Sequence, residues 1–581
     1  MKKNVMALSI AAMIGGLGFA GAASAAVIVG GGAAPAAPAT GATAAEVKTA
    51  AVAGKLIPAN ATGLAIADGG VGNALVVPYF NAQNGNMTVL HVTNTDTNNG
   101  KVVKVRFRSA ANSDDLLDFQ LFLSPGDVWT AAVTADADGL TQLVTSDNTC
   151  TVPHIAKNTF IPFRKGNLPA FAADQNKLTR EGYVEIFNIA DITNADAWTS
   201  AGVADGAGTE KSPLYKNTKH VNGVAPCSVA GSAARTALDN LAIKTHTEDS
   251  AAKAGMQTPT GGLVGDWYIQ NVAQSTTFAG TATAIVATAA AGAKPYANFT
   301  HFPQVAEPEV LAVAADANKL TADALFRTDA YAADGTAFGA TPAKTLLSED
   351  VPDLSTPMLP ADIGDAKIQA QKLLTALAVK SVSNQYALNA SVSGKTDWVF
   401  SMPARRYNVV ANYAAVSGTS GATGPTSANA KYRLFTPVTA GAPAAADWFR
   451  PIIAGAAGNT TVDSATGNIC VYADKQTFWD REETTGTTGP TFSPGASTKA
   501  SFCGEVSVLA MADTGASVLG AQVARSDTNP GYASGWARID TANAGPGLPI
   551  VGASFIKLTN PSAAPGIMGT YGITWPHRYT K

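Results

Sequence analysis

Residues 101–108 read KVVKVRFR, and this stretch carries the clearest secondary-structure pattern in the chain. Its residues alternate between an apolar and a basic set: Val103, Val105 and Phe107, then Lys104, Arg106 and Arg108. Successive side chains of a β-strand point to opposite faces, so a period of two predicts a strand with one apolar and one charged face.

Similar segments lie on both sides of this strand at a spacing of about ten residues, which is typical of all-β folds. Strands are predicted at 74–80 (ALVVPYF), 87–93 (MTVLHVT), 116–123 (LLDFQLFL) and 128–133, and again at 182–189 and 265–272. The clusters NTDTNNG at 94–100 and SPGD at 124–127 have the composition of turns. Short strands joined by such turns predict an antiparallel sandwich or barrel.

Helical periodicity interrupts the strands at three places. A short helix is predicted at 232–244, with Ser232 as its N-cap. Two more are predicted at 311–325 and 362–379, and Asp362 is the expected cap of the last. Strand-like segments then return between 397 and 557.

The predicted fold class is therefore mainly β, with two antiparallel β-sandwich-like regions joined by a helical segment, after a signal peptide and a flexible arm. The expected boundaries are 1–25 for the signal peptide, 26–61 for an Ala/Gly/Pro-rich arm, 62–305 for the first mostly-β domain, 306–390 for the helical connector and 391–581 for the second mostly-β domain.

The first 25 residues have the pattern of a secretory signal peptide. Lys2 and Lys3 precede an apolar segment, and Ala23-Ser24-Ala25 is a small-residue cleavage site. The alternative is an uncleaved membrane anchor. No other run reaches the roughly 18 apolar residues that a transmembrane helix needs, so the sequence predicts an exported protein without a transmembrane span.

Composition excludes two broad classes of protein. Charged residues make up 14% of the 581 residues and the formal net charge is −3, which argues against nucleic acid as a partner. Hydrophobic residues make up 46%, whereas a disordered chain combines low hydropathy with high net charge.

The chain has four cysteines, at positions 150, 227, 470 and 503. An even number in an exported protein predicts two disulfides, and three connectivities are open. Pairing Cys150 with Cys227 and Cys470 with Cys503 is favoured, because each bond then lies within one predicted domain. A zinc site is disfavoured, since the chain shows neither C-x-x-C spacing nor a neighbouring histidine pair.

Clustered acids make Ca²⁺ the one metal worth considering. Asp136 and Asp138 belong to the sequence DADG, and Asp114 and Asp115 stand close to Asp118. Carboxylate oxygens beside a glycine turn are ligands that suit Ca²⁺. The stronger interpretation is that these acids are solvated turn residues, because the expected glutamate at the end of a calcium loop is absent.

No residue is predicted to be catalytic, and no cofactor is certain. The six histidines are scattered, and His91, in a predicted strand, is better explained as a structural residue than as a base. The sequence shows no nucleophile elbow, P-loop or dinucleotide fingerprint in a suitable context. The eight tryptophans could form a platform that stacks on sugars, although core positions are the commoner role of aromatics in strands.

Three stretches resemble exported, S-layer-like cell-surface proteins of Gram-negative bacteria. They are 72–133, 396–407 (TDWVFSMPARRY) and 571–581 (YGITWPHRYTK), and together they cover about a seventh of the chain. The resemblance implies a location at the cell surface or outside the cell and a structural role. It carries over no catalytic residue.

The sequence thus favours a non-enzymatic, exported structural protein that self-associates into a surface layer or filament. Its expected partners are copies of itself and, for retention on the cell, a component of the envelope. The alternative is an adhesin or carbohydrate-binding surface module that uses exposed aromatic residues. An exported hydrolase is the third and least supported hypothesis.

Overall fold

The computed structural model describes residues 27–32, 54–169, 171–194, 198–199, 202–203, 211–304, 352–363, 366–407, 409–411, 432–434, 461–462, 468–472, 475–483, 485–486, 501–511, 517–541 and 547–581. The predicted signal peptide and the predicted helix at 311–325 lie outside these residues. Within them, no helix is both long and apolar enough to cross a bilayer.

The first β region consists of two antiparallel sheets that pack against each other. Between them the rings of Phe119 in one sheet and Trp129 in the other meet at a tilt of 59°, with their centroids 5.5 Å apart. The larger sheet has the order β1 (Gly63–Ile66), β16 (Thr283–Thr288), β2 (Ala74–Asn81), β10 (Glu181–Ile192), β4 (Gly100–Ser109), β5 (Asp115–Leu123) and β8 (Cys150–Val152), with β13 (Met256–Gln257) beside β10. The smaller has the order β15 (Thr276–Thr281), β14 (Leu263–Asn271), β3 (Asn86–Asn94), β6 (Val128–Ala135), β7 (Thr141–Thr145) and β9 (Ile161–Pro162). The fold class is mainly β, and these strands confirm the strands predicted between 74 and 272.

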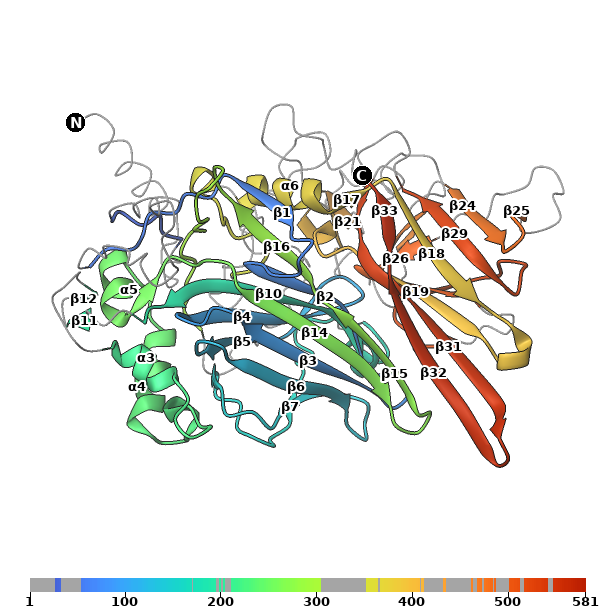
Figure 1. The fold of residues 1–581 in the computed structure, drawn as a ribbon, viewed down its shortest axis with the longest axis horizontal. Coiled ribbons are helices and arrows are strands. Elements are labelled where there is room, and N and C mark those ends of the chain that lie inside the picture. The colour runs from blue at the N-terminus through green and yellow to red at the C-terminus, as the bar shows by residue number, and fades with distance from the viewer. Residues whose placement is uncertain are drawn as a thin grey trace.

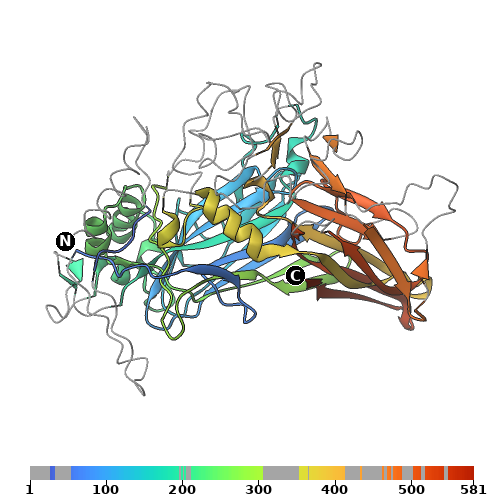
Figure 2. The ribbon, with the colours of Figure 1, turned by 90° about the horizontal axis from the view of Figure 1, so that it is seen from above.

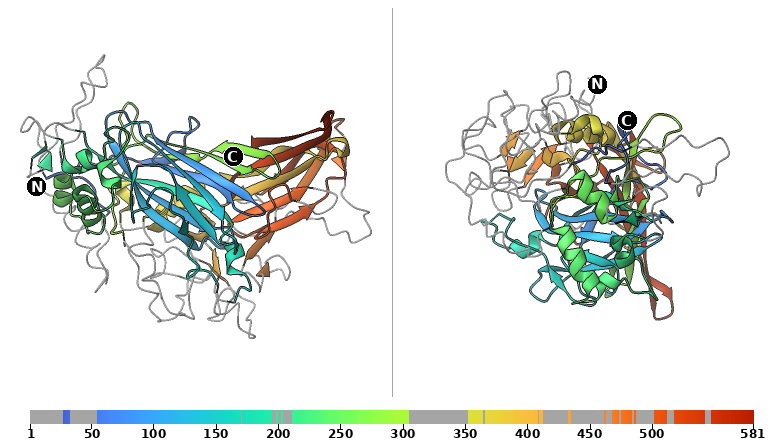
Figure 3. Two further views of the ribbon diagram at one scale, coloured as in Figure 1. Left: turned by 90° about the horizontal axis from the view of Figure 1, so that it is seen from below. Right: turned by 90° about the vertical axis from the view of Figure 1, so that its left-hand side faces the viewer.

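The second β region also has two principal sheets. One has the order β25 (Thr485–Gly486), β24 (Lys475–Asp480), β29 (Ser534–Asp540), β18 (Ser381–Ala387) and β33 (Arg578–Thr580). The other has the order β28 (Arg525–Thr528), β27 (Val506–Met511), β19 (Lys395–Ser401), β31 (Val551–Ala564) and β32 (Ile567–Pro576). The strands pair antiparallel except β27 and β28, which are parallel. Figure 3 shows the two β regions lying end to end.

Four short sheets complete the β structure among the described residues. Three of them have two strands: β11 (Trp198–Thr199) with β12 (Gly202–Val203), β17 (Ala378–Val379) with β30 (Leu548–Pro549), and β20 (Val409–Ala411) with β21 (Tyr432–Leu434). The fourth has three strands, in the order β22 (Thr461–Val462), β23 (Ile469–Tyr472) and β26 (Ser501–Cys503).

Three helices gather at the far end of the first β region, at the left of Figure 1: α3 (Pro213–Thr218), α4 (Ala233–Ala242) and α5 (Glu248–Ala254). Helix α4 confirms the helix predicted at 232–244, and Ser232 Oγ caps it by accepting from the Arg235 N–H at 3.0 Å. The short helix α2 (Gln175–Leu178) precedes β10. Single 3₁₀ turns are η1 (Pro226–Ser228), η4 (Pro360–Asp362), η5 (Ala390–Val392) and η6 (Arg405–Tyr407).

Helix α6 (Ala366–Leu377) lies next to β1 of the first region and next to β30 of the second (Figure 2). It confirms most of the helix predicted at 362–379, but the predicted cap is wrong. Asp362 belongs to the preceding turn η4, and both of its carboxylate oxygens accept from Lys372 Nζ at 2.8 Å. The carboxylate therefore binds a side chain within the helix instead of capping the start of the helix.

A single apolar cluster runs through both β regions. Phe555 of β31 contacts Phe278 and Trp267 of the first region, with ring centroids 5.5 and 5.9 Å apart. It also packs edge-on to Tyr79 at 6.4 Å. The two regions therefore bury their apolar faces against each other, and the domain boundaries stated above remain predictions.

Candidate functional site

The basic face of β4 is buried. Its side chains Lys104, Arg106 and Arg108 lie on the outer side of the larger sheet and are at most 5% exposed. The segments that cover them include residues 300–304, 352–363 and 403–407, which supply partners such as Gln304 and Asp353. Burying a cation is unfavourable unless it is paired, so this face requires carboxylates.

Each cation of this face has a carboxylate partner. Lys104 Nζ contacts Asp118, Arg106 Nη1 lies 2.6 Å from Asp115 Oδ2, and Arg108 Nε lies 3.6 Å from Glu185 Oε2. Arg164 Nη1 adds a second cation to Asp118 at 3.6 Å. We call these residues, with Asp353 and Arg406, the ionic layer.

Within the ionic layer, burial and the neighbouring charges shift pKa values in opposite directions. Burial lowers the pKa of Lys104 to about 8, even though Asp118 favours the charged amine. Burial alone would raise the pKa of the Asp118 carboxyl, but the charges of Lys104, Arg106 and Arg164 hold that pKa below its ordinary value. Asp118 is therefore ionised, and its carboxylate is paired with Lys104 and Arg164.

Arg406 extends the ionic layer into the second β region. It follows β19, and its Nη2 donates to Glu185 Oε1 at 3.2 Å and to Asp353. Its guanidinium also lies over the Tyr407 ring, 4.4 Å from the centroid. The layer thus joins the two β regions by buried ionic contacts, and its geometry is that of a structural clamp.

The acids predicted as calcium candidates lie at two separate places, one beside each sheet of the first β region. Asp115 begins β5 and pairs with Arg106, and Asp114 immediately precedes it. Asp136 lies in the turn between β6 and β7, where its Oδ1 accepts from the N–H groups of Asp138 and Leu140 at 2.9 and 2.8 Å. Among the residues that the structure describes, no group of three or more His, Cys, Asp or Glu side chains could hold a metal ion. Binding of Ca²⁺ stays a prediction.

Two histidines illustrate what the sequence could and could not indicate. His91, the one considered as a base, has Nδ1 2.9 Å from Thr130 Oγ1 on the neighbouring strand. His301 was not singled out, because nothing in its sequence context marks it. It is fully buried, neither of its ring nitrogens has a hydrogen-bond partner, and its ring meets that of His246 edge-on at 4.8 Å. Burial lowers the pKa of His301 well below its usual value, so the ring is neutral.

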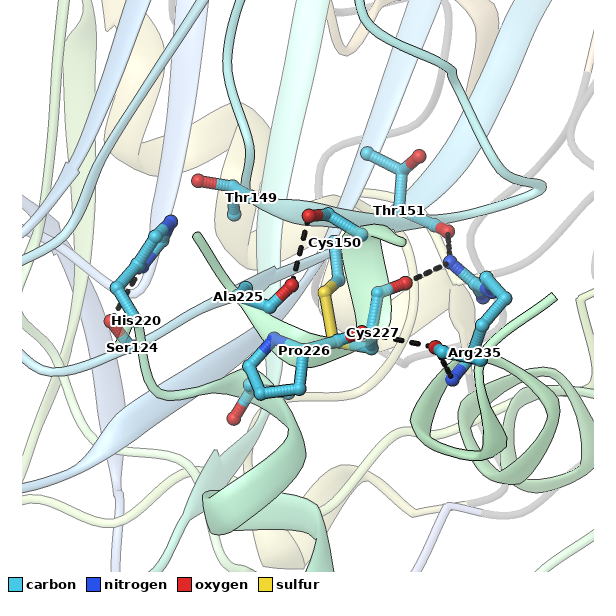
Figure 4. Close-up of a disulfide and its surroundings, with 12 residues drawn as sticks. Ser124, Thr149, Cys150, Thr151, His220, Ala225, Pro226, Cys227 and Arg235 are labelled. Carbon is cyan, nitrogen blue, oxygen red and sulfur yellow. Dashed lines mark hydrogen bonds between the residues drawn. A yellow bond between two sulfur atoms is a disulfide. The ribbon is translucent and has the colours of Figure 1, made fainter. Parts of the chain in front are cut away.

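Both predicted disulfides are confirmed. Cys150 of β8 bonds to Cys227 of η1, and Cys470 of β23 bonds to Cys503 of β26. Figure 4 shows that Arg235 of α4 lies beside the first bond, where Nη1 donates to the carbonyl oxygens of Thr151 and Cys227 at 2.7 and 3.3 Å. The disulfide and this arginine together fasten the helical end to the larger sheet.

Among the described residues of the second β region, the large apolar side chains with the highest exposed fractions gather on one β-hairpin. Strands β31 and β32 extend beyond the rest of the molecule, at the lower right of Figure 1. We call residues 558–576 of this hairpin the arm from here on; the Ala/Gly/Pro-rich segment predicted at 26–61 is a different segment. Ile567, Met568 and Tyr571 of the arm are 59, 65 and 57% exposed. The arm contains no Lys, Arg, Asp or Glu.

Strand β32 is an edge strand among the described residues, since it pairs with β31 alone. Where β32 passes β15, the two backbones come close: a Cβ added at Gly572 would lie 2.2 Å from the Thr277 carbonyl oxygen. Beyond this contact no described strand other than β31 pairs with the outer half of β32, and its apolar side chains are exposed. An edge strand of this kind can pair with another chain.

No family model, curated protein or solved structure matches this chain.

Proposed function

We propose that this chain is an exported structural protein of the cell surface, which associates with copies of itself through the arm. The observation that carries the proposal is the exposure of Ile567, Met568 and Tyr571 on an uncharged, projecting edge hairpin. Exposed apolar groups gathered in one place favour a protein contact, and an uncharged surface can enter that contact without desolvating ions.

The buried charges support a structural role for the chain. The cations of the ionic layer are paired with carboxylates, and the Arg406–Glu185 pair ties the two β regions together. Groups held in such pairs contribute to a rigid body that can carry a protruding contact element.

Export is supported by the disulfides. Both bonds are formed, and structural disulfides persist in oxidising compartments outside the cytoplasm. The signal-peptide pattern at 1–25 and the resemblance to S-layer-like proteins point to the same location. Immunodetection in fractionated cells tests this part, and a reduced cytoplasmic pool of the mature chain would contradict it.

Sedimentation velocity of the mature chain over a range of concentrations tests self-association. Met568→Asp places a charge on the arm and should shift the chain to monomer. Val221→Asp is the matched control, because Val221 is 60% exposed on the first β region and Met568 is 65% exposed. The control should assemble like the wild type.

Electron microscopy of the purified wild type, with and without a chelator, shows whether the assembly is a layer or a filament and whether it needs Ca²⁺. A monodisperse monomer under all these conditions would refute the proposal, and so would an equal effect of the two substitutions.

A further inference from the structure

Two tryptophans stack face to face on the surface of the second β region, on strands outside the arm. Trp479 of β24 and Trp536 of β29 are directly opposite in the antiparallel register. Their ring planes differ by 6° and the ring centroids are 4.0 Å apart. Trp536 is nevertheless 41% exposed.

Polar side chains surround this pair on the same face of the sheet. Gln385 of β18 lies opposite Trp536 on its other side, and it is exposed. Two residues along, Arg538 lies between Thr477 and Ser383 in the register. The alternate residues Phe478, Ala537 and Ile539 are buried and supply the apolar face of the sheet.

The core does not account for the position of Trp536. An indole in the core would be buried, and the inner face of β29 is already filled by smaller apolar residues. One face of the Trp536 ring is covered by Trp479. Since β18 is the next strand on the other side, the second face of the ring is directed toward the Gln385 side of the sheet.

We propose that this tryptophan face, made of Trp479, Trp536, Gln385, Thr477 and Arg538, binds a sugar ring of a glycan. One side of a pyranose ring presents C–H groups, which pack on an indole, and its rim presents hydroxyls. An amide, a hydroxyl and a guanidinium beside the indole provide the donors and acceptors that such hydroxyls need.

The charges on this face favour a neutral or weakly acidic glycan. Arg538 Nε donates to Asp540 Oδ1 at 2.7 Å, so the guanidinium is held in place and partly neutralised. Lys475, opposite Asp540 in the register, and Arg578, opposite Ser383, are further cations on this face. Stacking of nucleic acid bases also uses aromatic side chains but relies on a cationic groove for the phosphates, which a chain of net charge −3 does not favour.

The test uses the full mature chain on a glycan array, followed by calorimetry with soluble hexasaccharides of glucose, N-acetylglucosamine and mannose. At least one of these glycans should bind. Trp536→Ala should weaken binding by about tenfold, the scale of one aromatic contact. Phe160→Ala is the matched control, because Phe160 is an aromatic residue that is 52% exposed and lies outside both the tryptophan face and the arm, and this substitution should leave the affinity unchanged.

Gln385→Ala keeps the experiment decisive if the tryptophan variant misfolds. The Gln385→Ala variant should retain the circular-dichroism couplet of the two stacked indoles, and its glycan binding should still be several-fold weaker than that of the wild type. An array on which no glycan binds overturns the inference, as does an affinity that Gln385→Ala leaves intact or that Phe160→Ala lowers as much as Trp536→Ala.

The result of the glycan-binding test can be distinguished from the result of the test of self-association through the arm. Met568→Asp should abolish self-association and leave glycan binding intact, whereas Trp536→Ala should do the opposite. A chain that binds glycans but stays monomeric would contradict the proposed function and support this inference.

Discussion

Arg406 and Glu185 form a buried ion pair, Nη2 to Oε1 at 3.2 Å, across 221 positions of sequence. Arg406 follows a strand of the second β region, and Glu185 lies in β10, a central strand of the first. The side chains of both are at most 2% exposed. The contact therefore holds the two regions together at a place that water does not reach.

Removing one partner of this pair should destabilise the protein strongly. Arg406→Met leaves Glu185 and Asp353 with less compensating charge in the interior, and the expected loss is about 3–5 kcal/mol of the free energy of unfolding. Urea unfolding followed by circular dichroism measures the change.

Arg538→Met is the control for this substitution, since Arg538 forms an ion pair with Asp540 that is largely open to solvent. Exposed pairs contribute under about 1 kcal/mol. If the Arg406 variant lost no more stability than the Arg538 variant, the ionic layer would not be a clamp.

Stability should also depend on the protonation of Asp397. Burial raises the pKa of this carboxyl from 3.8 to about 6, although Ser517 and the Leu519 N–H donate hydrogen bonds to it. The folded state then binds this proton more tightly than the unfolded state. Its contribution is complete below pH 3.8 and is lost as the pH rises through about 6.

Asp397→Asn removes this loss, because the amide does not titrate. The free energy of unfolding of the variant, relative to wild type, should rise by roughly 3 kcal/mol between about pH 4 and about pH 7. Ser517→Ala takes away a hydrogen bond that lowers the pKa, so it should move the wild-type decrease to higher pH. A difference between variant and wild type that is independent of pH would show that Asp397 does not titrate in this range.

The two disulfides should differ in how readily they are reduced. Cys150 and Cys227 are fully buried, whereas Cys470 and Cys503 are half-buried. Limited reduction followed by alkylation and mass spectrometry should therefore label Cys470 and Cys503 first. Early labelling of Cys150 would contradict this order.

Their contributions to stability should follow the lengths of the loops that they close. The bonds span 77 and 33 positions of sequence. Loop-closure entropy predicts losses of about 4.5 and about 3.8 kcal/mol when each pair is replaced by serine. Urea unfolding of the two double variants measures both losses.

Replacing Gly572 with a larger residue should cause a steric clash, because a Cβ there would lie 2.2 Å from the Thr277 carbonyl oxygen on β15. Gly572→Ala should push β32 away from the first β region and lower stability by about 1–3 kcal/mol in urea unfolding. Gly69→Ala is the control, since no atom lies within 4 Å of its added Cβ. Equal stability of the two variants would mean that the contact can relax freely.

Much of the fold was predictable because its pattern is local. The strand at 101–108 shows a period of two, and Ser232 precedes a helical periodicity. The disulfide pairing followed from grouping cysteines by region. Strand β32 was missed, because Gly569, Gly572 and Pro576 interrupt its alternation. At Gly572 the missing side chain serves a contact with another sheet that the sequence does not display.

The candidate functional surfaces could be identified only from the tertiary structure. From the sequence, KVVKVRFR indicated a strand with a charged face, and eight tryptophans were equivalent candidates. Two carboxylates of that face, Asp115 and Asp118, lie on the next strand. The other partners and the burial of the face depend on Glu185, Asp353 and Arg406, which are distant in sequence. Strand register alone brings Trp479 opposite Trp536. Local sequence determines which elements form, because propensity and periodicity act over a few residues, whereas burial and pairing depend on which distant segments pack together.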